Sequence, residues 1–334
     1  MKKLRIGLMG AGRLGRSILR LAVAHPQIEV AAISDPASAA SLAYLLQYDS
    51  ILGPAADPVR VVGDGLSWGK QQIALLPGRD PGEVAWSDAR VDIVIEATAQ
   101  PRRRADAKKH LDRGAQRVIL CVPCADPDVT LSMGINEGML SPSHRIIAAG
   151  SPTGHAAAWT LQTLQASFGL RRAFCTQVHA YTGKQHLADA PADDLRRARA
   201  ATCSIVPQPL DLGDELAALV PAARGLLSSM ALHVPLANGA LVDLVTYTER
   251  PVSVAAVNEA MGAAAALHGG RFAVTDDPIV SSDVKLSPLS GTFDRQATMA
   301  LGEHAIKTLT WYDCSWGYAH RTLELALHLA QGGF

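Results

Sequence analysis

The sequence lacks a net charge, because its 334 residues include 31 basic and 31 acidic side chains. A neutral chain offers no field that attracts nucleic acid or a membrane surface, so both partners are disfavoured. No apolar run reaches the roughly 18 residues that indicate a transmembrane helix. The opening MKKLRIGLMGAG meets glycine too early for a signal peptide. Five scattered cysteines fit a reducing cytoplasm better than a secreted disulfide scaffold.

The sequence also lacks a complete zinc motif. Cys121 and Cys124 form a C-x-x-C pair, but neither a second such pair nor paired histidines accompany it. A redox C-x-x-C opens a helix, whereas this one closes a predicted strand. We therefore expect ordinary strand-end residues here and predict no metal.

Residues 4–16, LRIGLMGAGRLGR, run from an apolar strand into Gly10-x-Gly12-x-x-Gly15. An amphipathic helix and a second strand, EVAAIS, follow, and Asp35 comes 20 residues after Gly15. This order is typical of a dinucleotide-binding turn, whose glycines allow close approach to a pyrophosphate. Asp35 can accept from both ribose hydroxyls and would repel a 2′-phosphate, which favours NAD over NADP. A structural turn without a ligand is the alternative.

Alternating strands and helices continue through the first half. VDIVIEAT (91–98) has the continuous apolar character of a buried parallel strand, ADAKKHLDRGA reads as a helix, and RVILCVPC as the next strand. This alternation predicts an α/β, doubly wound, Rossmann-type dinucleotide-binding domain over residues 1–151. An amphipathic C-terminal helix, 315–334, is expected to pack back on it.

The second half has a different pattern. The predicted strands are FCTQVHAYT (174–182), LLSSMALHVP, ALVDLVTYTE, FAVTD and AIKTLTWYD, with one helix, SVAAVNEAMGAAAALH, among them. Several strands in succession predict an α+β catalytic or substrate domain over residues 152–314, with a mostly antiparallel sheet.

The stretch AAGSPTGHAAAW (148–159) joins the two halves. It turns at Gly150-Ser151 and enters an alanine-rich helix, with Pro152 at the first turn, where the missing amide has no helical partner. Such strand-to-helix turns favour anions and nucleophiles. The hydrolase pattern G-x-S-x-G fails here at Ala149.

Together these segments resemble glyceraldehyde-3-phosphate dehydrogenase over about residues 5 to 327. GAGRLGR, SDP, QYDS, GRDP, HAYT, DLRRARAA, DPIVSSD and WYD..WGY occur in family order at family spacing. The resemblance implies the two-domain fold, NAD as cofactor, and assembly as a homodimer or homotetramer.

The resemblance also implies functional positions. The cofactor set is Gly10, Gly12, Arg13, Leu14, Gly15, Asp35, Arg79, Thr98, Cys121 and Cys314. The substrate set is Ser151, Thr153, His155, Thr182, Arg197 and His233, with His179 of HAYT as the catalytic base.

Several of these positions depart from the family pattern. The family nucleophile is a cysteine in S-C-T-T-N-C, and Pro152 occupies its position here, while Ala156 stands at the second cysteine. Proline carries no nucleophile, so covalent catalysis is impossible at this position. Leu210-Asp211 replaces the Thr-Gly pair that holds inorganic phosphate.

Two further departures concern charged and polar contacts. His233 replaces an arginine, and Cys314 replaces the asparagine that would hold the nicotinamide amide. Histidine is mostly uncharged near neutral pH, whereas the charged, planar guanidinium of arginine binds phosphate through two hydrogen bonds. Phosphorylating activity is therefore not expected.

Three functions fit these observations. The first is thiol-free hydride transfer on a small polar alcohol or carbonyl, with His179 as base and Arg197 with His155 holding the substrate. The second is a non-catalytic paralogue that binds NAD or assembles with other proteins. The third uses a relocated thiol such as Cys314 or Cys121. Cys175 shares a strand face with His179, but four residues at ~3.3 Å each separate them by roughly 13 Å.

Overall fold

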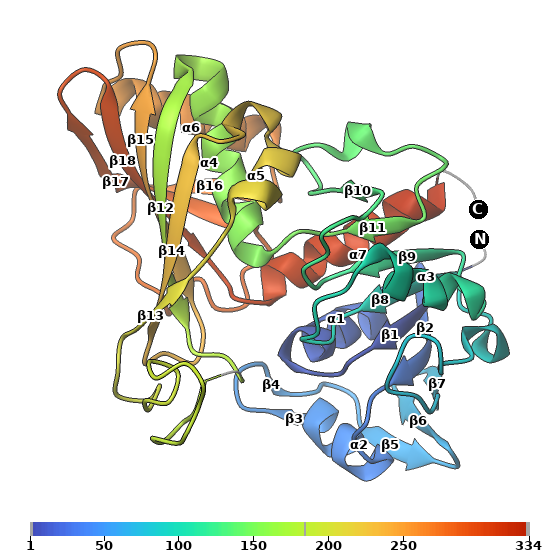
Figure 1. The fold of residues 1–334 in the computed structure, drawn as a ribbon. Helices are drawn as coiled ribbons and strands as arrows, with labels where there is room; N and C mark the ends of the chain where they lie inside the picture. Colours follow the sequence, from blue (N-terminus) through green and yellow to red (C-terminus); the bar gives the residue numbers. More distant parts are fainter. Residues whose placement is uncertain (1–2, 184, 332–334) are drawn as a thin grey trace. The chain divides into compact units, whose positions relative to one another are not determined.

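The structure is a computed structural model that describes residues 3–183 and 185–331 (Figure 1). The chain separates into two compact units. The first contains residues up to Met133, Glu137–Ser151 and the chain from Ala319 on, and the second contains Gly134–Asn136 and Pro152–Tyr318. Within the described residues, no helix combines the length and apolar character needed to cross a membrane.

The first unit is built on a nine-stranded sheet with the order β10-β11-β9-β8-β1-β2-β7-β6-β5. The six strands from β10 to β2 pair in parallel, as do β2 and β7, while β5, β6 and β7 pair antiparallel. Their bounds are β1 (Leu4–Met9), β2 (Ile28–Ser34), β5 (Val59–Val62), β6 (Gly65–Trp68), β7 (Gln71–Leu75), β8 (Ile93–Glu96), β9 (Arg117–Leu120), β10 (Val129–Thr130) and β11 (Ile146–Ala148). The short strands β3 (Tyr48–Asp49) and β4 (Gly53–Pro54) form a separate pair.

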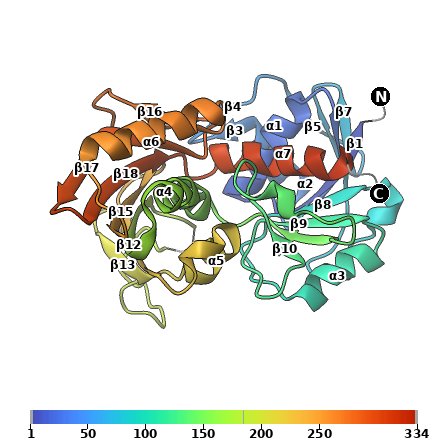
Figure 2. The ribbon, with the colours of Figure 1, turned by 90° about the horizontal axis from the view of Figure 1, so that it is seen from above.

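Helices cover both faces of this sheet. They are α1 (Arg13–Ala24), α2 (Ala39–Gln47), α3 (Arg104–Asp112) and α7 (Trp316–Gln331). Figure 2 shows α1 and α7 on one side of the strands and α3 on the other. Ile93, Val94 and Ile95 of β8 are fully buried, as a parallel strand covered on both faces requires.

The last helix was predicted over 315–334. In the structure α7 begins at Trp316, and residues 332–334 lie outside the described residues. Arg117 of β9 donates to the carbonyl of Leu329, so the end of α7 is bonded to the nine-stranded sheet.

The second unit contains a seven-stranded sheet with the order β13-β14-β12-β15-β18-β17-β16. Four of its pairings are antiparallel, and the pairs β12·β14 and β16·β17 are parallel. The bounds are β12 (Leu170–Ala180), β13 (Val206–Pro209), β14 (Leu227–Val234), β15 (Ala240–Thr248), β16 (Phe272–Thr275), β17 (Gly291–Leu301) and β18 (Ala305–Tyr312). The predicted fold class, a Rossmann-type domain with a mostly antiparallel α+β domain, is thus confirmed.

Helices α4 (Pro152–Phe168), α5 (Gly213–Leu219) and α6 (Val254–Leu267) belong to the second unit. Nine consecutive residues of α4, from Thr153 to Leu161, are buried. The small side chains Ala156, Ala157 and Ala158 let the helix lie close to the sheet, and Trp159 stacks on Phe272 with ring centroids 5.4 Å apart. The start of α4 is therefore held rigidly by packing.

Candidate cofactor and substrate site

The glycine turn between β1 and α1 has the geometry that its spacing predicts. Gly10 has a φ of +92°, and a Cβ there would lie 2.8 Å from the backbone nitrogen of Thr98. A Cβ on Gly15 would lie 2.1 Å from the Gly10 carbonyl oxygen, whereas a Cβ on Gly12 would meet no heavy atom within 4 Å. Gly10 and Gly15 thus serve close packing, and Gly12 borders open space.

Gly12 is the residue that precedes α1, and it supplies no side-chain cap to the helix. The first turn of α1, where Arg13 and Leu14 are half-buried, also carries no acidic residue. Open space beside Gly12 at a helix start suits a pyrophosphate, so the turn fits the dinucleotide that the sequence predicts.

Asp35 follows β2 and is fixed by two backbone amides. Its Oδ2 accepts from the amide of Ala11 at 2.7 Å, and its Oδ1 accepts from the amide of Ala37 at 2.9 Å. A carboxylate oxygen can accept more than one hydrogen bond, so both oxygens of Asp35 can still accept hydrogen bonds from ribose hydroxyls.

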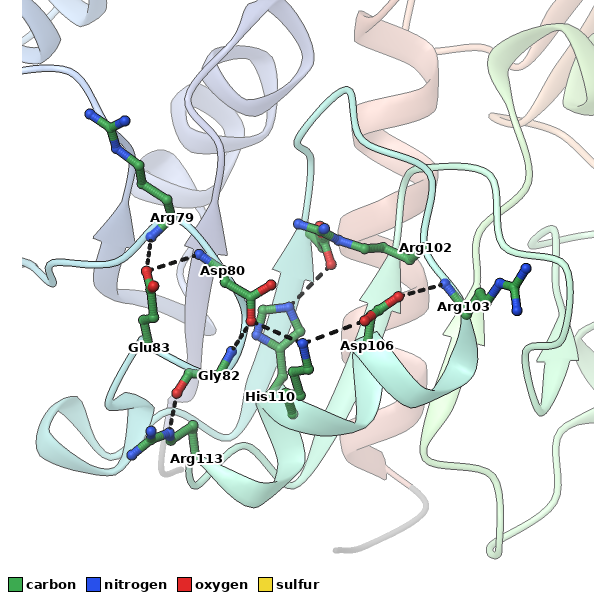
Figure 3. A network of polar contacts seen from close by, with 11 residues as sticks. Arg79, Asp80, Gly82, Glu83, Arg102, Arg103, Asp106, His110 and Arg113 are labelled. Carbon is green, nitrogen blue, oxygen red and sulfur yellow. Dashed lines mark hydrogen bonds and ion pairs between the residues drawn. The ribbon is translucent and has the colours of Figure 1, made fainter.

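Arg79 lies in the loop after β7, and the backbone of this loop is held by acidic side chains (Figure 3). Glu83 accepts from the amides of Arg79 and Asp80 at 2.7 and 3.2 Å, and the pKa of Glu83 is lowered mainly by these bonds. The Gly82 amide and Lys109 likewise lower the pKa of Asp80. The side chain of Arg79 points away from this network and is exposed.

Thr98 follows β8, and its hydroxyl donates to Glu96 at 2.8 Å. Glu96 is fully buried. Burial alone would raise the pKa of Glu96, but hydrogen bonds from His110 and Thr98 and the charge of Arg102 outweigh it and lower the pKa. Glu96, His110 and Arg102 are absent from the predicted site, because no sequence pattern marks a buried ion pair.

Cys121 and Cys124 follow β9, and both are half-buried thiols without a disulfide. The Sγ of Cys121 lies 3.8 Å from the hydroxyl of Thr322. Burial raises the pKa of Cys124, which opposes formation of a thiolate. Among the described residues, no group of three or more His, Cys, Asp or Glu side chains could hold a metal ion.

The predicted substrate residues at the start of α4 differ in their burial. Ser151 and Pro152 are half-buried, but Thr153 and His155 are only 4% and 2% exposed. The ring of His155 packs 5.1 Å from that of Tyr318. This burial favours a packing role for His155 over the substrate contact predicted with Arg197.

The hydroxyl of Thr153 belongs to a buried polar triad with Gln177 and Tyr312. The Gln177 amide donates to Thr153 Oγ1 at 2.6 Å and to the Tyr312 hydroxyl at 3.1 Å, and the two hydroxyls are 2.9 Å apart. Burial raises the pKa of Tyr312, so its phenol stays protonated. Thr153 was predicted to bind substrate, but its hydroxyl is engaged inside the protein, joining α4 to β12 and β18.

His179 lies near the end of β12, beside His233 of β14. The two residues are register partners in the parallel pair, and their rings meet edge to face with centroids 5.6 Å apart. His179 Nδ1 is 2.5 Å from the carbonyl oxygen of Ala180. Because a carbonyl only accepts, Nδ1 carries the hydrogen and Nε2 of the neutral ring keeps its lone pair.

Burial and the positive charge of Arg197 lower the pKa of His233. The imidazole of His233 is therefore uncharged at neutral pH.

The loop before β13 places Arg197 3.4 Å from Asp194 and Arg199 3.3 Å from Asp189, in exposed ion pairs. Thr182 donates through both its amide and its hydroxyl to Gln185.

Two further thiols, those of Cys175 and Cys314, are buried. Cys175 is 1% exposed, and burial raises its pKa to about 12. Cys314 is 8% exposed, and its amide donates to Asn238. Only a thiolate attacks efficiently, so burial disfavours Cys175 as a nucleophile, and the relocated-thiol hypothesis for Cys314 or Cys121 stays a prediction.

Comparison with known proteins identifies the family to which the chain belongs. Residues 4–104 match the model described as "Glyceraldehyde 3-phosphate dehydrogenase, NAD binding domain", and residues 151–314 match the corresponding C-terminal domain. The chain is 39% identical over 331 residues to glyceraldehyde-3-phosphate dehydrogenase of Geobacillus stearothermophilus, covering 98% of this chain and 99% of that protein. It is 37% identical over 333 residues to the protein of that name from Priestia megaterium, with the same coverage.

The thiol environments predict a pattern of chemical labelling. Iodoacetamide at pH 7.5 should modify the exposed Cys203 of the native protein and leave Cys175 unmodified, because a thiol with a pKa of about 12 is almost wholly protonated. Peptide mass spectrometry, with the unfolded protein as control, measures both. Fast labelling of Cys175 in the native state would contradict this assignment.

Proposed function

Because the chain belongs to the glyceraldehyde-3-phosphate dehydrogenase family of NAD-binding oxidoreductases, we propose that it transfers hydride without a covalent thiol intermediate. The substrate is a small polar alcohol or its carbonyl product. One observation carries the proposal: the residue that begins α4, at the position of the family nucleophile, is Pro152, which has no nucleophilic atom.

The reaction needs one proton acceptor from the protein. NAD, when held at the glycine turn between β1 and α1, would supply the acceptor for the hydride, the substrate C–H hydrogen with its electron pair. The hydroxyl proton passes to Nε2 of His179, and the remaining C–O bond becomes a carbonyl. The bond of Nδ1 to the Ala180 carbonyl supports this role, since it fixes the tautomer in which Nε2 accepts a proton.

Three positions that the resemblance links to phosphate binding, His233, Leu210 and Asp211, support a substrate without a phosphate group. His233 is neutral. Leu210 packs against the apolar core, and Asp211 is exposed and accepts from the amide of Gly213 at 2.9 Å. None of the three supplies the positive charge that phosphate binding favours.

A non-catalytic paralogue is the second candidate. The observation that favours it is that predicted substrate residues are engaged within the chain: Thr153 accepts from Gln177, and Arg197 pairs with Asp194. Such a protein would bind NAD and lack turnover.

Turnover and its loss in a His179 variant separate these candidates. Wild-type protein, given NAD and a panel of small polyols, hydroxy acids and aldehydes, should form NADH at a rate independent of added phosphate. His179→Ala should lower kcat by about 10²–10⁴-fold, the usual contribution of a general base. His186→Ala, which removes an exposed histidine of the same unit, is the matched control. Folded, NAD-binding protein that turns over none of the panel would establish the non-catalytic candidate instead.

We further propose a preference for NAD over NADP, which rests on the charge of Asp35. Asp35→Asn removes the repulsion of a 2′-phosphate, so the ratio of NADP to NAD dissociation constants should fall at least about tenfold, the equivalent of 1.4 kcal/mol. Titration calorimetry measures both constants, and Asp64→Asn, at an exposed position, is the control. An unchanged ratio in a folded variant would refute the role of Asp35.

Assembly as a homodimer or homotetramer is also our proposal. The apolar side chains Phe174 and Met230, on the second sheet, are 50% and 42% exposed, which supports burial against another copy. The molar mass in solution tests it. A cytoplasmic location stays a prediction.

A further inference from the structure

A buried carboxylate in the first unit is bonded to three side chains. Glu96, the last residue of β8, accepts from Thr98 and from Arg102 Nε through Oε1, at 2.8 and 2.5 Å. Its Oε2 lies 3.1 Å from Nε2 of His110 on α3. Figure 3 shows Arg102 and His110 converging at this end of the strand. Both carboxylate oxygens are therefore bonded.

The hydrogen positions in this cluster are fixed by Trp86. Its indole N–H donates to Nδ1 of His110 at 2.9 Å, and both side chains are fully buried. An indole nitrogen only donates, so Nδ1 of His110 is the acceptor and Nε2 carries the hydrogen that Glu96 receives. With this arrangement of hydrogens, Glu96 is an anion and His110 is neutral. The positive charge that compensates Glu96 is that of Arg102.

Arg102 uses only part of its donor capacity in this cluster. Its backbone amide donates to the Pro123 carbonyl and its Nε to Glu96, while its side chain is 12% exposed. Among the residues that the structure describes, neither terminal guanidinium nitrogen has a hydrogen-bond partner. A guanidinium is planar, so the bond at Nε also sets the direction of the two remaining nitrogens.

The cluster adjoins the dinucleotide turn and the loop that carries Arg79. Thr98, which shares Oε1 of Glu96 with Arg102, has its backbone nitrogen against Gly10, where a Cβ would lie at 2.8 Å. The charge of Arg102 also lowers the pKa of Asp80, the residue after Arg79. Arg102 is thus placed at the carboxyl ends of the parallel strands, where open α/β sheets bind their ligands.

We propose that Arg102 binds the adenylate half of NAD through its two terminal nitrogens, with Glu96 as the residue that positions it. Adenylate is anionic, and a preoriented guanidinium offers it charge-assisted hydrogen bonds. The inference rests on use of NAD and is independent of whether the protein turns over a substrate.

The test compares binding of the two halves of the cofactor by calorimetry. Arg102→Gln keeps a donor for Glu96 but removes the charged fork, so the dissociation constants of ADP and NAD should rise about tenfold or more. The dissociation constant of nicotinamide mononucleotide should stay unchanged. Arg103→Gln, which removes the exposed neighbouring charge, should bind ADP as the wild type does.

Positioning by Glu96 is tested in the same way. Glu96→Gln should weaken ADP binding while leaving nicotinamide mononucleotide binding intact, a split that general loss of stability would not produce. If Arg102→Gln does not fold, Arg102→Lys replaces it, because its single ammonium is taken by Glu96 and ADP binding should still fall.

Wild-type affinity for ADP in a folded Arg102 variant, or an equal loss in Arg103→Gln, overturns the proposal. Absence of NAD binding by the wild type overturns it together with NAD use, whereas lack of turnover alone affects only the proposed reaction.

Discussion

The proposed chemistry depends on one constraint, a proline at the first position of a buried helix. Pro152 begins α4, and the nine residues that follow it, as far as Leu161, are buried. Proline suits that position because its missing amide would have no helical partner. Proline carries no nucleophilic atom, so the reaction that we propose uses only a base of the protein and the cofactor.

In both units, the position of a histidine hydrogen is set by a partner that can only accept or only donate a hydrogen bond. The Ala180 carbonyl can only accept, which assigns the hydrogen of His179 to Nδ1. The Trp86 indole can only donate, which assigns the hydrogen of His110 to Nε2. In one unit the outcome is a basic nitrogen beside a neutral His233. In the other it is a compensated carboxylate that orients Arg102.

Features fixed by local sequence could be predicted, and features made by distant contacts could not. The spacing of Gly10, Gly12 and Gly15 predicts a turn whose close contacts the structure contains. By contrast, Gln177 joins Thr153 and Tyr312 across separations of 24 and 135 residues, which no local pattern encodes. Strand β17 was not predicted either, because its polar segment, with a register shift between Asp294 and Met299, masks the alternation of a half-buried strand.

The most direct test of the central claim is turnover by a variant without cysteine. Replacing Cys121, Cys124, Cys175, Cys203 and Cys314 with alanine removes every thiol from the chain. If hydride transfer needs only NAD and His179, this variant should form NADH from the active substrate with a kcat within a few fold of the wild type. A folded, NAD-binding variant that has lost turnover would contradict the account, because a thiol would then take part in the reaction.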